Sequence, residues 1–142
     1  IASNVTLFFA STGGGLTRLS VRNFGTQKTA GGRRLDADSF ASTDDNLRTT
    51  NPLVSSVVAD YANADLFLYE SGTLTASNTS FQTAGTTSDT DSTGVSIAGN
   101  LAGAEGLEGF LGEIVFYQRA LAAAERQLVE RALGKKWGIA VA

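Results

Sequence analysis

The side chains that could do chemistry in this 142-residue chain are carboxylates, hydroxyls and a few aromatic rings, because the sequence has neither histidine nor cysteine. Histidine is the usual general base near neutral pH, and it is the commonest transition-metal ligand. A Ser-His or Cys-His nucleophile pair is therefore excluded. The absence of cysteine also means that packing alone, without disulfides, must hold the fold.

A run of alternating oxygen ligands is the strongest metal-like pattern in the chain. Asp89-Thr-Asp91-Ser-Thr-Gly94 resembles the opening of a calcium loop, in which a glycine makes the sharp turn after the ligands. The acid expected at the twelfth position is Asn100 instead. Aspartate, serine and threonine at this density also occur in any solvated loop. Calcium bound by Asp89 and Asp91 and a plain polar loop therefore both stay open, and we expect no other cofactor.

Glu113 and Arg119 are the charged residues that bracket the passage from an apolar run into a helix-like segment. Because buried charges are expected to be paired, we predict a structural ion pair between them that ties strand to helix. Catalysis by Glu113 is the less favoured interpretation, since no run of acids on one strand face accompanies it.

Two aromatic residues lie in polar surroundings and are candidates for ligand contact. Tyr61 lies in a loop-like segment with Asn63, and Phe81 lies with Asn78 in the Ser- and Thr-rich stretch Thr73–Gly94. Exposed rings can stack on sugars or anchor a protein partner. The alternative is that each ring folds back onto the core.

The sequence predicts that the elements which position these residues are mostly strands. Runs of β-branched and aromatic residues alternate with glycine-rich turns, and Glu70-Ser71-Gly72 is predicted to be the turn of a three-residue hairpin with a bulge. Thr73–Gly94 is predicted to be a surface excursion. The predicted strands are Val5–Ala10, Leu16–Phe24, Arg33–Phe40, Leu53–Ala59, the two arms of Asp65–Ala76, Val95–Ile97 and Phe110–Tyr117.

The last third changes its apolar period from two to about 3.6 residues, which indicates a strand followed by a helix. Phe110–Tyr117 is apolar on both faces, so both faces should be covered. Ala122 is at the N-cap position, Glu125 at the reciprocal position, and Gly138 can end the helix. The helix is predicted to cover the outer face of the sheet with an apolar stripe made of Leu121, Ala124, Leu128, Ala132, Leu133 and Trp137.

The pattern Gly-x-Leu-Gly-Glu-Ile-x-x-Tyr-x-Arg-Ala-Leu at Gly109–Leu121, followed by Glu125–Glu130 and by Lys-Lys-Trp-Gly at Lys135–Gly138, resembles the C-terminal signature of laminin G-like domains. These concanavalin A-like jelly rolls occur in tailed-phage virion proteins and bacterial surface proteins. The hairpin Leu68–Leu74 and the run Val95–Gly99 resemble the elements before that signature. The resemblance covers roughly the second half of the chain.

This resemblance implies an antiparallel jelly-roll β-sandwich with one C-terminal helix on its outer face. Glycosidases on the same fold carry Glu-x-Asp-x-(x)-Glu on one strand, and this chain has no such run. We therefore expect a non-enzymatic structural or surface-recognition module of a phage virion, such as a fibre, tail or capsid decoration, that contacts host carbohydrate. The alternative is a bacterial extracellular, lectin-like carbohydrate-binding or adhesion module.

Composition sets the remaining bounds. The length fits one domain, residues 1–142, and the start at Ile1 in a strand-like run is also typical of the C-terminal part of a longer chain. The net charge of −3, with acids and bases interleaved, argues against a nucleic-acid partner. No apolar run approaches the roughly 20 residues of a membrane-spanning helix. We expect virion proteins or further copies of the chain as partners, together with cell-surface glycan, at a virion surface or outside the cell.

Overall fold

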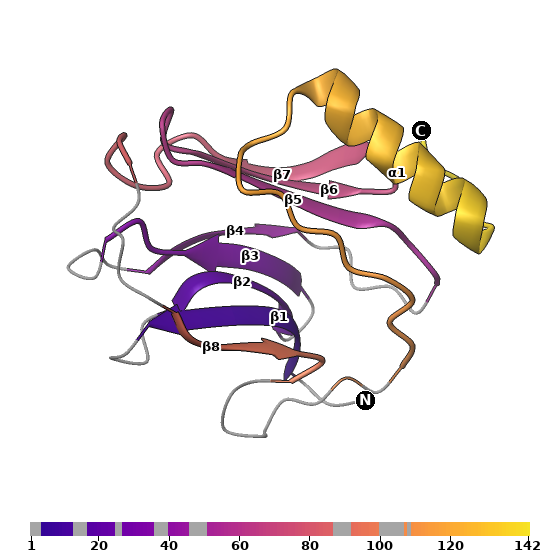
Figure 1. Cartoon of the computed structure of the whole chain (residues 1–142), viewed down its shortest axis with the longest axis horizontal. Coiled ribbons are helices and arrows are strands. Elements are labelled where there is room, and N and C mark those ends of the chain that lie inside the picture. The colour runs from indigo at the N-terminus through magenta and orange to yellow at the C-terminus, as the bar shows by residue number, and fades with distance from the viewer. Residues whose placement is uncertain are drawn as a thin grey trace.

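Two antiparallel β-sheets pack face to face, and one C-terminal helix lies against the smaller sheet (Figure 1). This computed structural model describes residues 4–12, 17–24, 27–35, 40–45, 51–86, 92–99, 107 and 109–142. The mostly β architecture with one terminal helix agrees with the sequence-based prediction.

The larger sheet has five strands in the order β4-β3-β2-β1-β8. The first four follow one another as successive hairpins, and β8 returns from far along the chain to pair with β1. The strands are β1 (Asn4–Thr12), β2 (Thr17–Phe24), β3 (Gln27–Gly32), β4 (Ala41–Asp45) and β8 (Ser92–Ile97).

The smaller sheet is a three-stranded meander, β5-β6-β7, made of Ser55–Asp60, Asp65–Glu70 and Thr73–Asn78. The predicted hairpin at Glu70-Ser71-Gly72 is present, but its turn has two residues, Ser71 and Gly72, both with positive φ. The predicted bulge lies further along, where Leu68 faces Ala76 and Tyr69 faces Leu74, so that Thr75 is the extra residue.

The core lies between the sheets, and four buried residues form it among the side chains that the structure describes. Leu66 and Leu68 alternate along β6 with residues that face the other way, and they pack with Ala30 of β3 and with Phe81. The segment after β7 folds back onto the core, and the backbone N–H of Phe81 donates to the carbonyl of Ala64. The Phe81 side chain is therefore only 1% exposed.

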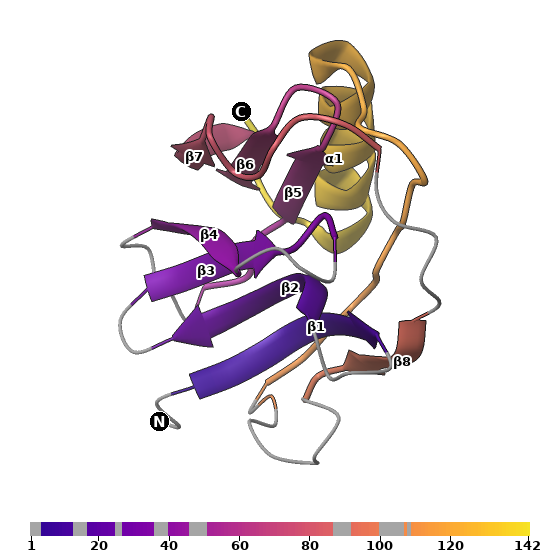
Figure 2. The same ribbon diagram turned by 90° about the vertical axis from the view of Figure 1, so that its left-hand side faces the viewer.

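The helix α1 spans Ala123–Trp137 and covers the outer face of the three-stranded sheet (Figure 2). It begins after Ala122, whose N–H donates to the Glu125 carboxylate (3.0 Å), and it ends at Gly138 in the left-handed conformation, as the sequence predicts. No helix among the described residues is long and apolar enough to cross a bilayer.

Most of the predicted apolar stripe is not on the buried face of this helix, since only Leu121 and Leu133 of its six residues are half-buried. Leu128 is 68% exposed, whereas Arg126, Glu130 and Gly134 are buried. The guanidinium of Arg126 lies 3.5 Å from the centre of the Tyr69 ring on β6 and pairs with Glu130, and this stacked pair fills the space that apolar side chains were expected to fill.

Two predicted strands are also wrong. Of the strand predicted at Arg33–Phe40, the described residues 33–35 and Phe40 lie outside any strand, residues 36–39 lie outside the described part of the chain, and β4 begins at Ala41. Phe110–Tyr117 joins neither sheet. It belongs to an extended segment, residues 109–122, that runs past the outer edge of β5 to the start of α1 (Figures 1 and 2), and we name this segment the strap.

Candidate functional site

A charged network joins the two sheets beside the apolar core. The Lys28 ammonium on β3 donates to Glu70 Oε1 on β6 (2.6 Å) and lies 2.9 Å from Ser55 Oγ on β5. The Ser55 hydroxyl in turn lies 3.0 Å from each Glu70 oxygen. Lys28 and Glu70 are almost fully buried, so the pair is shielded from solvent.

Asp45 on β4 extends this network. One of its oxygens accepts from the backbone N–H of Lys28 (3.2 Å), and the other accepts from the Thr75 hydroxyl on β7 (2.9 Å). Each of β3 to β7 therefore contributes one member of the network. An arrangement of this kind holds the sheets in register, because a relative shift of one residue would leave buried charges unpaired.

Burial raises the pKa of Glu70, although the neighbouring Lys28 ammonium and the Ser55 hydroxyl oppose that rise. The dominance of desolvation means that the carboxylate is held in a water-poor setting by its partners. Lys28 and Ser55 also line the wall of an open groove, so the network closes one side of that groove.

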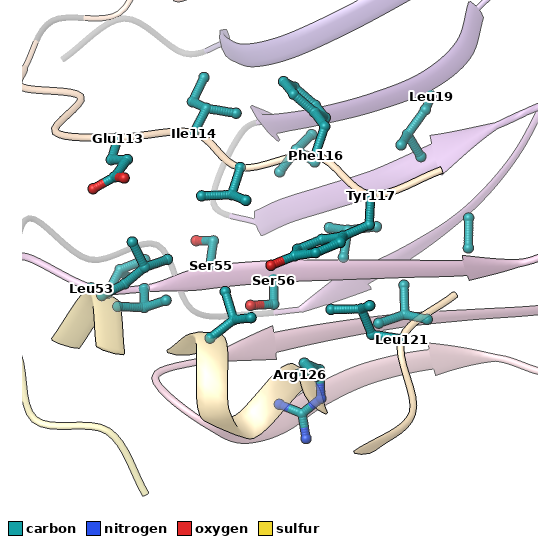
Figure 3. A pocket seen from close by; sticks show the side chains of 18 of the residues that line it. Leu19, Leu53, Ser55, Ser56, Glu113, Ile114, Phe116, Tyr117, Leu121 and Arg126 are labelled. Carbon is teal, nitrogen blue, oxygen red and sulfur yellow. The ribbon is translucent and has the colours of Figure 1, made fainter. Parts of the chain in front are cut away.

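The groove lies between β5, the strap, the helix and the nearer strands of the larger sheet, and its volume is about 1550 Å³. Figure 3 shows Ser55 on the side of β5 that faces the strap residues Ile114, Phe116 and Tyr117, whereas Ser56 points to the helix side. Leu19 of β2 lines the side formed by the larger sheet, and Arg126 belongs to the helix side.

The strap exposes most of its apolar side chains. Phe110 is fully exposed at 105%, and Phe116 and Tyr117 are about half exposed at 57% and 50%. Leu111 and Val115 are also exposed. The alternating apolar residues predicted a strand with both faces covered. In the structure they form an extended segment whose apolar side chains lie on both sides and are largely exposed.

Ion pairs fix the strap to the helix. The carboxylate of Glu113 accepts from Lys136 Nζ (2.7 Å) and from Trp137 Nε1 (3.3 Å), and these bonds lower its pKa. A Cβ added at Gly112 would lie 3.1 Å from the Trp137 ring, so the strap passes close over the indole.

Arg119 pairs with a different residue. Its guanidinium donates both terminal nitrogens to Glu125, each at 2.7 Å. The predicted pair between Glu113 and Arg119 is therefore replaced by two pairs, because the strap runs along the helix and brings Glu113 to its C-terminal end and Arg119 to its N-terminal end. Both pairs do connect the predicted strand region to the helix.

The four residues predicted to contact a ligand do not form one exposed patch. Phe81 is buried, which leaves no ring face for a sugar, and Tyr61 packs against it with ring centroids 5.6 Å apart. Asn78 donates to the carbonyl of Ser42 across the sheets (3.0 Å). Asn63 is exposed and bonds to Asp60 (2.8 Å). Each polar residue here has a local structural partner.

Asp89 and Asp91, the candidate calcium ligands, lie outside the described residues. Within the described residues, no three acidic side chains come together in a way that could hold a metal ion. Calcium binding at Asp89 and Asp91 stays a prediction.

Sequence reasoning missed both the inter-sheet network and the groove. A signal for the network exists, since Glu70 follows Leu66 and Leu68 at a spacing of two and Lys28 precedes Ala30 by the same spacing, which places both charges on inward faces. The groove has no such signal, because it arises from a segment that has the pattern of a strand but does not pair.

Comparison with known proteins adds no relative. No protein-family model, no curated protein and no solved structure matches this chain.

Proposed function

We propose that this chain is a non-enzymatic structural or surface-recognition module of a phage virion, built on a laminin G-like jelly roll. The observation that carries the proposal is the open groove beside the exposed strap. Contiguous exposed apolar surface of this kind is typical of a site that another protein covers. A virion surface, or another extracellular assembly, supplies such a neighbour.

The charged side chains support a structural role rather than catalysis. Four glutamates are each paired with a cationic side chain. The pairs are Glu70 with Lys28, Glu113 with Lys136, Glu125 with Arg119 and Glu130 with Arg126. Retaining hydrolysis of a glycoside would instead need two carboxyl groups about 5 Å apart around a substrate.

Immuno-electron microscopy tests the virion assignment. An antibody raised against the purified chain should label particles at a fixed position, and pre-immune serum should not. Labelling confined to host-cell surfaces, with bare particles, would overturn the assignment.

A carbohydrate-binding or adhesion module of a bacterial surface is the second candidate. It is favoured by the half-exposed rings of Tyr117 and Trp137, which line the same groove beside the Glu113 carboxylate, because sugar sites combine an aromatic face with polar groups. Binding on a glycan array that is lost in Tyr117→Ala and kept in Leu128→Ala would favour this candidate. Silence on the array together with self-association would favour the first.

A further inference from the structure

The β5 strand is the sheet edge that faces the groove, and over most of its length it has none of the features that usually prevent an edge from pairing. Four edge strands are present among the described residues: β4, β5, β7 and β8. In natural proteins, charges, prolines or bulges usually prevent an edge strand from pairing with another chain. β4 carries Asp44 and Asp45, β7 has the bulge at Thr75, and β8 has a register shift where Thr93 is the extra residue.

Over Ser55–Ala59, β5 has no bulge, charge or proline, and its one charged residue, Asp60, is at its end. The outer edge of β5 faces the groove, and the strap lies on the other side of that groove.

The strap next to this edge carries a projecting apolar set. Phe110 is fully exposed, and the bonds of Glu113 to Lys136 and Trp137 and of Arg119 to Glu125 place the strap along the helix, away from the core. The structure thus presents an apolar projection and an apolar hollow side by side on one face. A two-fold axis brings the same patch of two copies together, so that the projection of each copy can meet the hollow of the other.

We propose that this face is a homodimer interface, in which Phe110 and Phe116 of each copy fill the groove of the other, between β5 and the strap. The inference deepens the proposed structural role and rests on it, because it names the partner of the groove as a second copy of the chain.

The size of the site favours a polypeptide occupant. The groove, at about 1550 Å³, exceeds the roughly 300–1,000 Å³ of small-molecule pockets. The apolar side chains exposed along the strap and at Trp137 expose on the order of 700 Å² together, close to the ~800 Å² that each partner buries in a standard interface. This apolar surface is of the size that one partner contributes to a standard interface.

Light scattering over a range of concentrations tests the dimer. The purified chain should show twice the 14.7 kDa mass of one copy. Phe110→Asp should weaken the dimer at least about 30-fold, the ratio that corresponds to loss of one hot-spot residue. Because Phe110 touches little in its own copy, the variant should keep the circular dichroism spectrum and melting temperature of the monomer.

Leu128→Asp is the matched control. Leu128 is 68% exposed on the helix and does not line the groove, so its variant should dimerise as the parent does. A parent chain that stays monomeric at about 100 μM, or equal loss of the dimer in both variants, would overturn the inference.

Cross-linking locates the interface, since the chain has no native cysteine. A mixture of Ser56→Cys and Val115→Cys chains should form a mixed disulfide, whereas Ser56→Cys with Leu128→Cys should not. A cross-link only in the second mixture would place the interface elsewhere and refute the proposal. If the chain proved monomeric but the antibody still labelled particles, only the dimer would be refuted. If the chain proved dimeric but the antibody did not label particles, only the virion role would be refuted.

Discussion

At the scale of single residues, the inter-sheet network is the feature with the largest energetic consequences. Lys28 and Glu70 lie at positions where a β-sandwich ordinarily has apolar side chains, and each is satisfied only by residues from other strands. Removal of one partner leaves the other as an uncompensated buried charge, which costs more than the intact pair contributes.

Glu70→Gln should therefore lower the free energy of unfolding by about 3–5 kcal/mol, because the Lys28 ammonium loses its countercharge. Urea denaturation measures this. The double variant Lys28→Met/Glu70→Leu should be more stable than Glu70→Gln, since it removes both buried charges. A double variant less stable than the single one would show that the ion pair stabilises the fold beyond what apolar packing can replace.

Glu125 should give the folded chain a distinct acid response. Its bonds to Arg119 and to the Ala122 N–H lower its pKa to about 2. A carboxylate whose folded pKa is depressed contributes stability above its unfolded pKa of about 4.3, and loses it as the pH falls through about 2. The melting temperature of Glu125→Gln should therefore lie below that of the parent at pH 6, and the two should converge near pH 2. A constant difference across this range would contradict the assignment.

At the scale of elements, the helix was predictable in its ends but not in its orientation. The N-cap at Ala122, the reciprocal Glu125 and the C-terminal Gly138 follow from local chemistry, and the structure confirms all three. Which face is buried depends on what the sheet offers, and Tyr69 on β6 offers a ring that a guanidinium can stack on. The apolar stripe of the sequence contains no information about that partner.

Two glycines at the end of the helix allow a test of packing against backbone strain. A Cβ at Gly134 would lie 2.6 Å from both the Ile139 carbonyl oxygen and Val141 Cγ2. Gly134→Ala should destabilise the fold by about 1–3 kcal/mol through this overlap, although alanine usually favours a helix. Thermal denaturation measures the change.

Gly138→Ala is the comparison. No atom lies within 4 Å of the added Cβ there, so only the left-handed φ of 69° opposes it, at about 1–2 kcal/mol. If Gly134→Ala proved as stable as the parent, the C-terminal tail would have to pack on the helix less closely than the structure shows.

At the scale of the whole molecule, the class of fold and the β6-β7 hairpin were predictable, and the arrangement of the other strands in two sheets was not. Alternation and turn residues indicate a mostly β chain, as found. Phe110–Tyr117 shows why pattern alone fails, because a strand requires a partner edge as well as alternation, and the strap is fixed to the helix instead. The candidate site followed from this arrangement and so lay beyond what the sequence could predict.

Phe81 should prove central to overall stability although it lies in a polar, low-complexity stretch. It is 1% exposed and packs with Leu66, Leu68 and Ala30 in the core between the sheets. Phe81→Ala should cost about 3–5 kcal/mol, measured by chemical denaturation. Leu74→Ala is the control, since Leu74 is 49% exposed, and it should cost much less. Equal costs would mean that Phe81 is not part of the core.

The return of β8 to β1 has a kinetic consequence. The strands β1 to β4 and β5 to β7 can form as successive hairpins between near neighbours, whereas Phe8 meets Ile97 only after the intervening chain has been brought into place. Non-local pairing of this kind carries a loop-closure cost that must be met before any contact is gained, which slows folding. We therefore expect β8 to join last, so that a refolding chain spends part of its time with one side of β1 still open.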